Sequence, residues 1–164
     1  MKNVLRSPGL WALSLVVLAA CAGSAPSRSA APATPAAAEG WQRVQPGGAT
    51  RCARGGKYAF WLRRADPTKL LVFFQGGGGC FDVTTCEPGS MWFDDRVDSF
   101  DDPATHALGI LDLEDARNPF RDHSMVFIPS CTGDVHTGSR VVRYGPYRVQ
   151  QKGYLNARAA LDRA

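Results

Sequence analysis

Residues 70–80 read LLVFFQGGGGC, a run of apolar side chains that leads into four consecutive glycines. Residues 70–74 are apolar at every position, which is typical of a strand covered on both faces, as in parallel α/β folds. Glycine accepts backbone angles that other residues avoid, and it can place successive N–H groups on one side of the chain. The sequence therefore predicts a buried strand that ends in an anion-binding loop.

Two kinds of anion fit such a loop: the phosphate of a nucleotide and the oxyanion of an acyl-transfer intermediate. Phosphate loops follow a G-x-x-x-x-G-K-[ST] or G-x-G-x-x-G pattern, but here Cys80 and Phe81 follow the glycines. Hydrolases of the α/β class take oxyanion N–H donors from a Gly-rich segment after an early strand. A mobile glycine hairpin is disfavoured because a bonded Cys80 would fix the end of the loop. The pattern favours an oxyanion site.

Other elements can be placed around this loop. Residues 57–62 alternate, which predicts a strand with one buried face. Residues 125–129 predict a second buried strand, and the Ala- and Leu-rich residues 154–164 predict a helix. The long connection at 85–122 separates the two apolar strands. These elements indicate the α/β class.

Five aspartates gather in the long connection: Asp94, Asp95, Asp98, Asp101 and Asp102. A calcium loop has its ligands at regular spacing, which these residues lack, so a solvated acidic face is the favoured interpretation. We expect neither a metal nor a cofactor.

The cysteines after residue 40 form an even set of four: Cys52, Cys80, Cys86 and Cys131. In an exported chain such a set predicts disulfides, and four cysteines allow three pairings. Pairing Cys80 with Cys86 is the easiest local choice. A zinc site is disfavoured because no pair has C-x-x-C spacing. Cys131 as a nucleophile with His136 as its base is a weaker alternative.

The N-terminal region is predicted to be an export signal followed by a linker. Residues 1–21 have two basic residues, then a short apolar run, then LAAC, which predicts a removed export signal. LAAC resembles the lipobox of bacterial lipoproteins, so Cys21 is the predicted lipidation site and anchor to a membrane; a plain secretory signal is the alternative. Residues 22–40 lack Leu, Ile, Val and aromatic residues and predict a linker. We expect an exported, lipid-anchored protein of the cell envelope with a folded domain at 41–164.

Composition and charge exclude several classes. With 45% hydrophobic, 21% charged and 10% aromatic residues, the chain is neither disordered, collagen-like nor a coiled coil. The net charge is +4; two of these charges lie in the export signal and Arg28 balances Glu39, which leaves +2 for the folded part. Its basic residues are scattered, so we expect no nucleic-acid partner.

Several segments together resemble one family, the pectin acetylesterases and their Notum-like carboxylesterase relatives. The matching segments are PGGATRC at 46–52, LLVFFQGGGGC at 70–80, TC at 85–86, NPF at 118–120, VFIPSCTGDVH at 126–136 and KGYLNA at 152–157. The resemblance implies an α/β-hydrolase-like fold with a mostly parallel sheet. It also implies hydrolysis of a carboxylic ester, with an acylated carbohydrate or another ester as the substrate.

The resemblance further assigns roles to individual residues. It implies the pairs Cys80–Cys86 and Cys52–Cys131. Gly77 and Gly78 match the positions whose backbone N–H groups line the oxyanion hole of the family. Asp134 and His136 lie on a segment near the active-site face and are the expected substrate-binding residues.

A serine esterase also needs a nucleophile, a histidine base and an acid. The family nucleophile sits in a G-x-S-x-G turn after a further strand, and no serine between residues 41 and 164 has both glycines. His106 and His123 have simpler surface or structural roles, and for His136 substrate contact or a structural hydrogen bond is favoured over the role of base. We therefore expect the N-terminal portion of an α/β-hydrolase-like esterase, inactive by itself because its catalytic half is missing. The alternative is a non-catalytic envelope lipoprotein that uses the partial fold as a binding or structural module.

Overall fold

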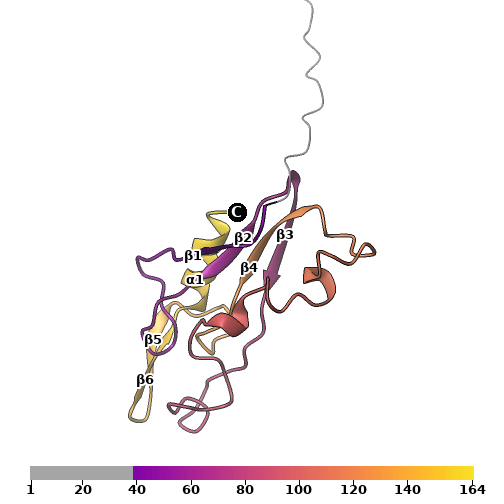
Figure 1. Ribbon diagram of the computed structural model, residues 1–164. Helices are drawn as coiled ribbons and strands as arrows, with labels where there is room; N and C mark the ends of the chain where they lie inside the picture. The colour runs from indigo at the N-terminus through magenta and orange to yellow at the C-terminus, as the bar shows by residue number, and fades with distance from the viewer. Residues whose placement is uncertain (1–38) are drawn as a thin grey trace, which may run out of the picture. The chain divides into compact units, whose positions relative to one another are not determined.

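The computed structural model describes residues 39–164 (Figure 1). Their elements, in chain order, are β1 Gln42–Val44, β2 Phe60–Arg63, β3 Asp66–Phe74, η1 Ser99–Asp101, η2 Gly109–Leu111, β4 His123–Ile128, β5 Arg140–Tyr144, β6 Tyr147–Gln151 and α1 Gly153–Leu161. The predicted export signal, Cys21 and nearly all of the predicted linker lie outside the described residues. No helix within 39–164 is long and apolar enough to cross a membrane.

Strands β1 to β4 form one sheet in the order β1-β2-β4-β3. β2 pairs antiparallel with β1, where Phe60 lies opposite Val44, and with β4, where Leu62 lies opposite Val126. β3 pairs parallel with β4, where Val72 lies opposite Val126. The sheet is therefore mixed.

The expectation of a mostly parallel sheet is wrong, because β3–β4 is the one parallel pairing of three in the sheet of the described residues. The physical reason is the connection between β2 and β3. Only Arg64 and Ala65 separate these strands, so the chain reverses direction there, and β4 lies between them. A strand between two oppositely directed neighbours must be antiparallel to one and parallel to the other.

β4 is an interior strand, flanked by β2 and β3, and confirms the buried strand predicted at 125–129. On one face, apolar residues of β2 and β4 pack beneath α1: Phe60, Leu62, Val126, Ile128, Ala157 and Ala160. On the other face they pack against the segment that contains η2: Trp61, Met125, Phe127 and Leu111. Both faces of β2 are thus buried, so the expectation that it would bury one face is wrong.

β3 differs from its prediction. The apolar run at 70–74 predicted a strand in the sheet interior, but β3 lies at the edge, with β4 on one side, and Leu70 and Phe74 are about half exposed. The run still packs Leu71 and Phe73 against β4, and the Phe73 and Phe127 rings stack 5.3 Å apart. An apolar run indicates side chains that are removed from water, but it does not indicate whether the strand lies in the interior or at the edge of the sheet.

Strands β5 and β6 form a two-stranded hairpin that the sequence analysis did not predict. Gly145 and Pro146 make its turn, and Gly145 has a positive φ of 56°. Val149 is fully buried and packs with Cys80, Cys86 and Phe93 in a separate small core. The hairpin therefore supports the region that follows the four glycines.

The predicted C-terminal helix is confirmed as α1. Its side chains Ala157 and Ala160 are buried against the sheet. Asn156 is buried and accepts the backbone N–H of Arg51 at 3.1 Å, while its amide donates to the Arg51 carbonyl at 2.9 Å. This pair of hydrogen bonds joins the helix to the segment that precedes β2.

Candidate functional site

The glycine loop, residues 75–80, begins where β3 ends. The N–H of Gln75 donates to the carbonyl of Ile128 at 2.9 Å, which extends the β3–β4 ladder by one step. The chain then leaves the sheet and runs beside the segment around Trp92 and Phe93. The loop therefore starts from a rigid element, the parallel pair at the sheet edge.

Backbone hydrogen bonds on both sides fix the middle of this loop. The N–H of Gly79 donates to the Trp92 carbonyl at 3.0 Å, and the N–H of Asp94 donates to the Gly77 carbonyl at 2.9 Å. A Cβ on Gly77 would lie 2.7 Å from the Cβ of the buried Ser130. The loop packs this closely against Ser130 only because Gly77 has no side chain.

The N–H groups of Gly77 and Gly78 have no hydrogen-bond acceptor among residues 39–164. Gly77 is half-buried and Gly78 is exposed. Backbone N–H groups are strong donors, and accessible ones can donate to water or to a ligand. Two adjacent donors, held in place and left without an acceptor, are suited to bind a small anion or an oxyanion.

Two disulfides confirm the predicted pairs, Cys80–Cys86 and Cys52–Cys131. They use all four cysteines of the described residues, so neither a four-thiolate zinc site nor a free Cys131 nucleophile exists there. Cys80 is also held by its N–H, which donates to Gly133 at 2.9 Å, and by its carbonyl, which accepts from the Gln151 amide at 2.8 Å. The exit of the glycine loop is thus firmly attached to the hairpin.

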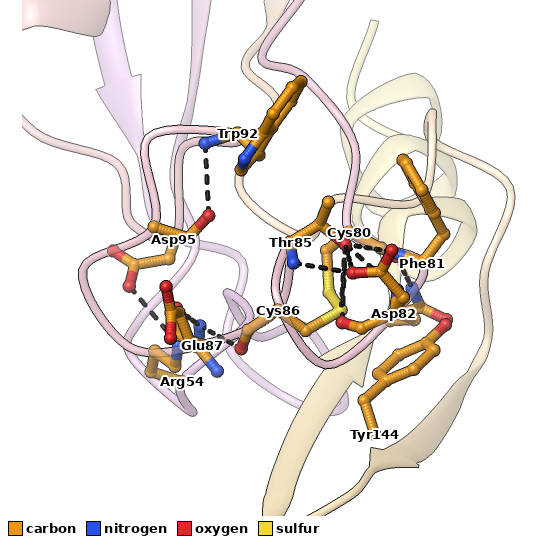
Figure 2. Close-up of a disulfide and its surroundings, with 12 residues drawn as sticks. Arg54, Cys80, Phe81, Asp82, Thr85, Cys86, Glu87, Trp92, Asp95 and Tyr144 are labelled. Carbon is orange, nitrogen blue, oxygen red and sulfur yellow. Dashed lines mark hydrogen bonds and ion pairs between the residues drawn. A yellow bond between two sulfur atoms is a disulfide. The ribbon is translucent and has the colours of Figure 1, made fainter.

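Arg54 clamps the loop that follows the local disulfide, as Figure 2 shows. Its guanidinium donates to the carbonyls of Cys86 and Glu87 at 2.8 and 2.9 Å and pairs with Asp95 at 3.3 Å. It also lies over the Phe93 ring, 5.5 Å from its centre. Arg54 therefore positions the segment around Trp92 and Asp94, whose backbone in turn bonds to Gly79 and Gly77.

Asp134 lies beside the glycine loop through an isolated antiparallel bridge with Gly79. Its carboxylate accepts the Thr132 hydroxyl at 2.7 Å through Oδ1 and the Gly153 N–H at 2.8 Å through Oδ2. Gly153 is the first residue of α1, where a carboxylate interacts favourably with the helix dipole. Asp134 thus ties the loop after β4 to the start of α1, and both of its oxygens are engaged within the chain.

His136 lies against the start of the glycine loop. Its Nε2 is 3.0 Å from the Gln75 carbonyl, which can only accept, so Nε2 carries the proton in this contact. Its ring meets Phe74 edge-on at 5.1 Å. Val135 and His136 both have positive φ angles, 54° and 60°, a conformation that is uncommon for such residues and often found at functional sites. In the neutral ring, Nδ1 is left as an acceptor.

The acidic residues of the long connection do not form the uniformly solvated face that their composition suggested. Asp94, Asp95, Asp98 and Asp101 line one cavity beside the glycine loop, and Asp101 is only 7% exposed. Burial raises the pKa of Asp101, and burial together with the nearby Asp98 and Asp95 raises the pKa of Asp94. Within residues 39–164, no group of three or more metal-ligating side chains converges.

The remaining histidines make local contacts. His106 Nδ1 lies 2.8 Å from the Thr105 hydroxyl, and His123 Nδ1 lies 3.0 Å from the Asp122 carboxylate. Neither residue lines the cavity beside the glycine loop.

Sequence reasoning missed several residues that shape this site, notably Arg54, Gln75, Trp92 and Asp94. Their roles depend on contacts between distant segments, which no local pattern reports. A signal was present only for the hairpin, since Gly145-Pro146 between runs rich in Val and Tyr is a turn pattern.

Comparisons with known proteins show the family of the chain. The Pectinacetylesterase family model matches residues 42–163. The palmitoleoyl-protein carboxylesterase NOTUM of Drosophila melanogaster is 33% identical over 92 residues, covering 54% of this chain and 14% of that protein. The NOTUM proteins of Schmidtea mediterranea and Homo sapiens are each 31% identical, over 96 and 91 residues, covering 56% and 54% of this chain.

The chain spans only 14–18% of the length of these curated relatives. No solved structure is significantly similar to it. The family match covers nearly all of the described residues, including the glycine loop, both disulfides and the segment with Asp134 and His136. The chain belongs to the pectinacetylesterase family.

Proposed function

We propose that this chain forms the oxyanion-binding part of a carboxylic ester hydrolase that acts on an acylated carbohydrate or a similar acyl ester. One observation carries the proposal: the N–H groups of Gly77 and Gly78 are held in place and have no acceptor among residues 39–164. Family membership supports the esterase class.

The chemistry follows from where charge develops. When a nucleophile adds to an ester carbonyl, negative charge moves onto the carbonyl oxygen, and donors already aimed at that position stabilise the transition state more than the ground state. One such donor contributes about 3 kcal/mol in well-studied hydrolases. The bonds of Gly79 to Trp92 and of Asp94 to Gly77 keep the donors from reorienting, which this effect requires.

His136 and Asp134 have different parts in the proposal. His136 Nε2 donates to Gln75 beside the loop, so Nδ1 can accept a hydrogen bond from a substrate hydroxyl. Both Asp134 oxygens already accept hydrogen bonds from Thr132 and Gly153. We infer that Asp134 holds the segment that carries His136 and supports substrate binding indirectly.

A full catalytic cycle also needs a nucleophile and a base. Residues 41–164 contain no G-x-S-x-G pattern, and the 91–96 matched residues make up only 14–18% of the curated relatives. We propose that the triad belongs to further sequence of a longer polypeptide and that this chain alone is inactive. Export with a lipid anchor at Cys21 remains part of the proposal, on the strength of the LAAC motif.

The test is to fuse residue 164 to the part of a pectinacetylesterase that follows the matched region. The fusion should hydrolyse p-nitrophenyl acetate with saturable turnover that a serine-directed inhibitor abolishes. The unfused chain should not exceed a heat-treated control; inhibitor-sensitive turnover by the unfused chain would contradict its proposed inactivity. A folded fusion without turnover would favour the non-catalytic binding or structural module.

A further inference from the structure

The β5–β6 hairpin (Figure 1) carries positive charges without a balancing acid. Residues 135–161, which contain the whole hairpin, hold five Lys or Arg residues and no Asp or Glu. Arg140, Arg143 and Arg148 belong to the hairpin itself and are exposed. None of the three forms an ion pair or a side-chain hydrogen bond within residues 39–164. The hairpin therefore has three positive charges that the described part of the chain does not neutralise.

Two of these arginines lie directly opposite each other, since Arg143 pairs with Arg148 in the register of the hairpin. The N–H of Gln150 donates to the Ala53 carbonyl, outside the hairpin, at 2.9 Å, so Gln150 and its partner Val141 form a non-hydrogen-bonded pair. Hydrogen-bonded and non-hydrogen-bonded pairs alternate along an antiparallel ladder. Arg143 and Arg148 lie two pairs further along and therefore also form a non-hydrogen-bonded pair, the kind in which side chains lie closest together.

Both arginines point to the outer face of the hairpin. Successive side chains of a strand point to opposite faces of the sheet. Val149 is fully buried, so its neighbours Arg148 and Gln150 point outward. Val142 lies opposite Val149 and shares the inner face, so its neighbours also point outward. The outer face of the hairpin consists of Val141, Arg143, Arg148 and Gln150.

The arrangement of Arg143 and Arg148 is unfavourable unless an anion is bound. Like charges directly opposite each other destabilise an antiparallel pair. The hairpin supplies no acidic neighbour to offset this repulsion, because residues 140–151 contain no Asp, Glu or His. A bound oxyanion removes the repulsion and accepts charge-assisted hydrogen bonds from the guanidinium groups, which match its geometry. The pair therefore has the properties of an anion-binding site.

We propose that the outer face of the hairpin binds a phosphomonoester group. Two adjacent guanidinium groups carry two positive charges, and a phosphomonoester at neutral pH carries nearly two negative charges on three acceptor oxygens. A carboxylate or a phosphodiester carries one charge and matches the pair less well. The amide of Gln150 makes no side-chain hydrogen bond within residues 39–164 and can donate to a phosphate oxygen. Val141, which is 40% exposed, offers an apolar contact to the organic part of the ligand.

The experiment is a titration of the whole chain with glycerol 3-phosphate, a soluble phosphomonoester, followed by the ¹H–¹⁵N signals of the arginine side chains. We expect saturable shifts of the Nε–H signals of Arg143 and Arg148 and none of Arg121, which is exposed and lies outside the hairpin. Dimethyl phosphate, a diester with one charge, should bind about fivefold more weakly, the upper end of what one exposed ion pair contributes. Lowering the pH through about 6 should weaken binding of the monoester alone, because the monoester takes up its second proton there.

A second arm of the experiment identifies the source of the phosphate group. Bicelles that contain phosphatidic acid present the same monoester as a lipid headgroup. Tighter binding to these bicelles than to glycerol 3-phosphate assigns the site to a lipid, and equal binding assigns it to a soluble ester. The site does not rest on the proposed esterase function, and its failure would leave the fused esterase assay untouched.

Matched variants separate binding from a structural role. Arg148→Gln removes one half of the arginine pair and should weaken binding of glycerol 3-phosphate about fivefold. It should also raise the melting temperature of the free chain, because the repulsion across the strands disappears. Arg121→Gln removes the same charge outside the hairpin and should change neither quantity. Equal affinity for the two phosphates, equal effects of the two variants, or a melting temperature lowered by Arg148→Gln would overturn the proposal.

Discussion

The backbone of Gly78 lies directly against the carbonyl group of Trp92. A Cβ built on Gly78 would come within 1.9 Å of the Trp92 oxygen, and Gly78 has a positive φ of 73°. No rotation of a side chain can relieve a contact between a Cβ and a backbone atom. The position therefore requires glycine for two independent reasons, space and backbone conformation.

Gly78→Ala should destabilise the fold strongly, because the loop and the Trp92 segment would have to separate. Steric overpacking costs about 1–3 kcal/mol, and the left-handed backbone adds about 1 kcal/mol for a residue with a side chain. Gly76→Ala is the matched control, since a Cβ there meets nothing within 4 Å and its φ is not positive. Urea unfolding of both variants checks this; equal losses of stability would mean that the contact does not constrain the loop.

The two disulfides should contribute unequally to stability. Cys52 and Cys131 are 79 residues apart, whereas Cys80 and Cys86 are 6 apart. In the chain-entropy model, the longer loop corresponds to about 4.5 kcal/mol and the shorter one to about 2 kcal/mol. Replacing Cys52 and Cys131 together by alanine should therefore lower the free energy of unfolding more than replacing Cys80 and Cys86. The opposite order in denaturant titrations would show that the short loop does more than constrain the unfolded chain.

Asp134→Asn should destabilise the junction between the loop after β4 and α1. Asparagine offers one neutral oxygen where the carboxylate offers two charged ones, so the Gly153 N–H that now donates to Oδ2 keeps at best a weaker acceptor. A hydrogen bond to a charged group contributes about 1 kcal/mol more than one to a neutral group. Asp162→Asn is the control, because Asp162 makes one exposed ion pair with Arg158, of a kind that contributes little to stability. Amide exchange of Gly153 should accelerate only in the Asp134 variant. Unchanged exchange would show that Asp134 does not hold the Gly153 N–H.

Asp94 and Asp122 should give opposite pH profiles of stability. The raised pKa of Asp94 comes first from burial, then from Asp98 and Asp95. A raised carboxyl pKa contributes stability below the ordinary value of about 3.9 that is lost as pH rises through the folded pKa. Asp94→Asn, which stays neutral, should therefore raise the melting temperature at neutral pH and have little effect near about pH 3, well below that value.

The comparison variant, Asp122→Asn, should change the stability at neutral pH in the opposite direction. Hydrogen bonds from Lys69 and then from His123 lower the pKa of Asp122 to about 2. This contribution is present above the ordinary carboxyl pKa and is lost as pH falls through the lowered value. Asp122→Asn should lower the melting temperature at neutral pH, and the difference should shrink under strongly acidic conditions. Parallel pH profiles for the two variants would contradict the assigned environments.

The sequence was sufficient for features that depend on local chemistry. The cysteine set predicted disulfides, and the family resemblance supplied their pairing. The apolar run before four glycines predicted a strand followed by a loop, and the alanine-rich end predicted α1. These features follow from composition and spacing over a few residues.

Features that depend on strand order could not be predicted in the same way. The apolar residues 70–74 suit an interior strand and an edge strand equally well, and the two-residue reversal after Arg63 decided the mixed sheet. The cavity beside the glycine loop could not be predicted from the sequence for a similar reason. Gln75 and Asp94 are nineteen residues apart, and only the folded chain brings Asp94 to the Gly77 carbonyl.

Gly77 and Gly78 should present free, fixed N–H donors to an oxyanion. The most direct measurement is a ¹H–¹⁵N correlation spectrum of the chain during titration with methylphosphonate, a tetrahedral oxyanion mimic. We predict saturable shifts of the Gly77 and Gly78 resonances and no comparable shift of Gly47 and Gly48, which also have positive φ angles and open surroundings. Unchanged Gly77 and Gly78 resonances, or equal shifts at all four glycines, would contradict the claim.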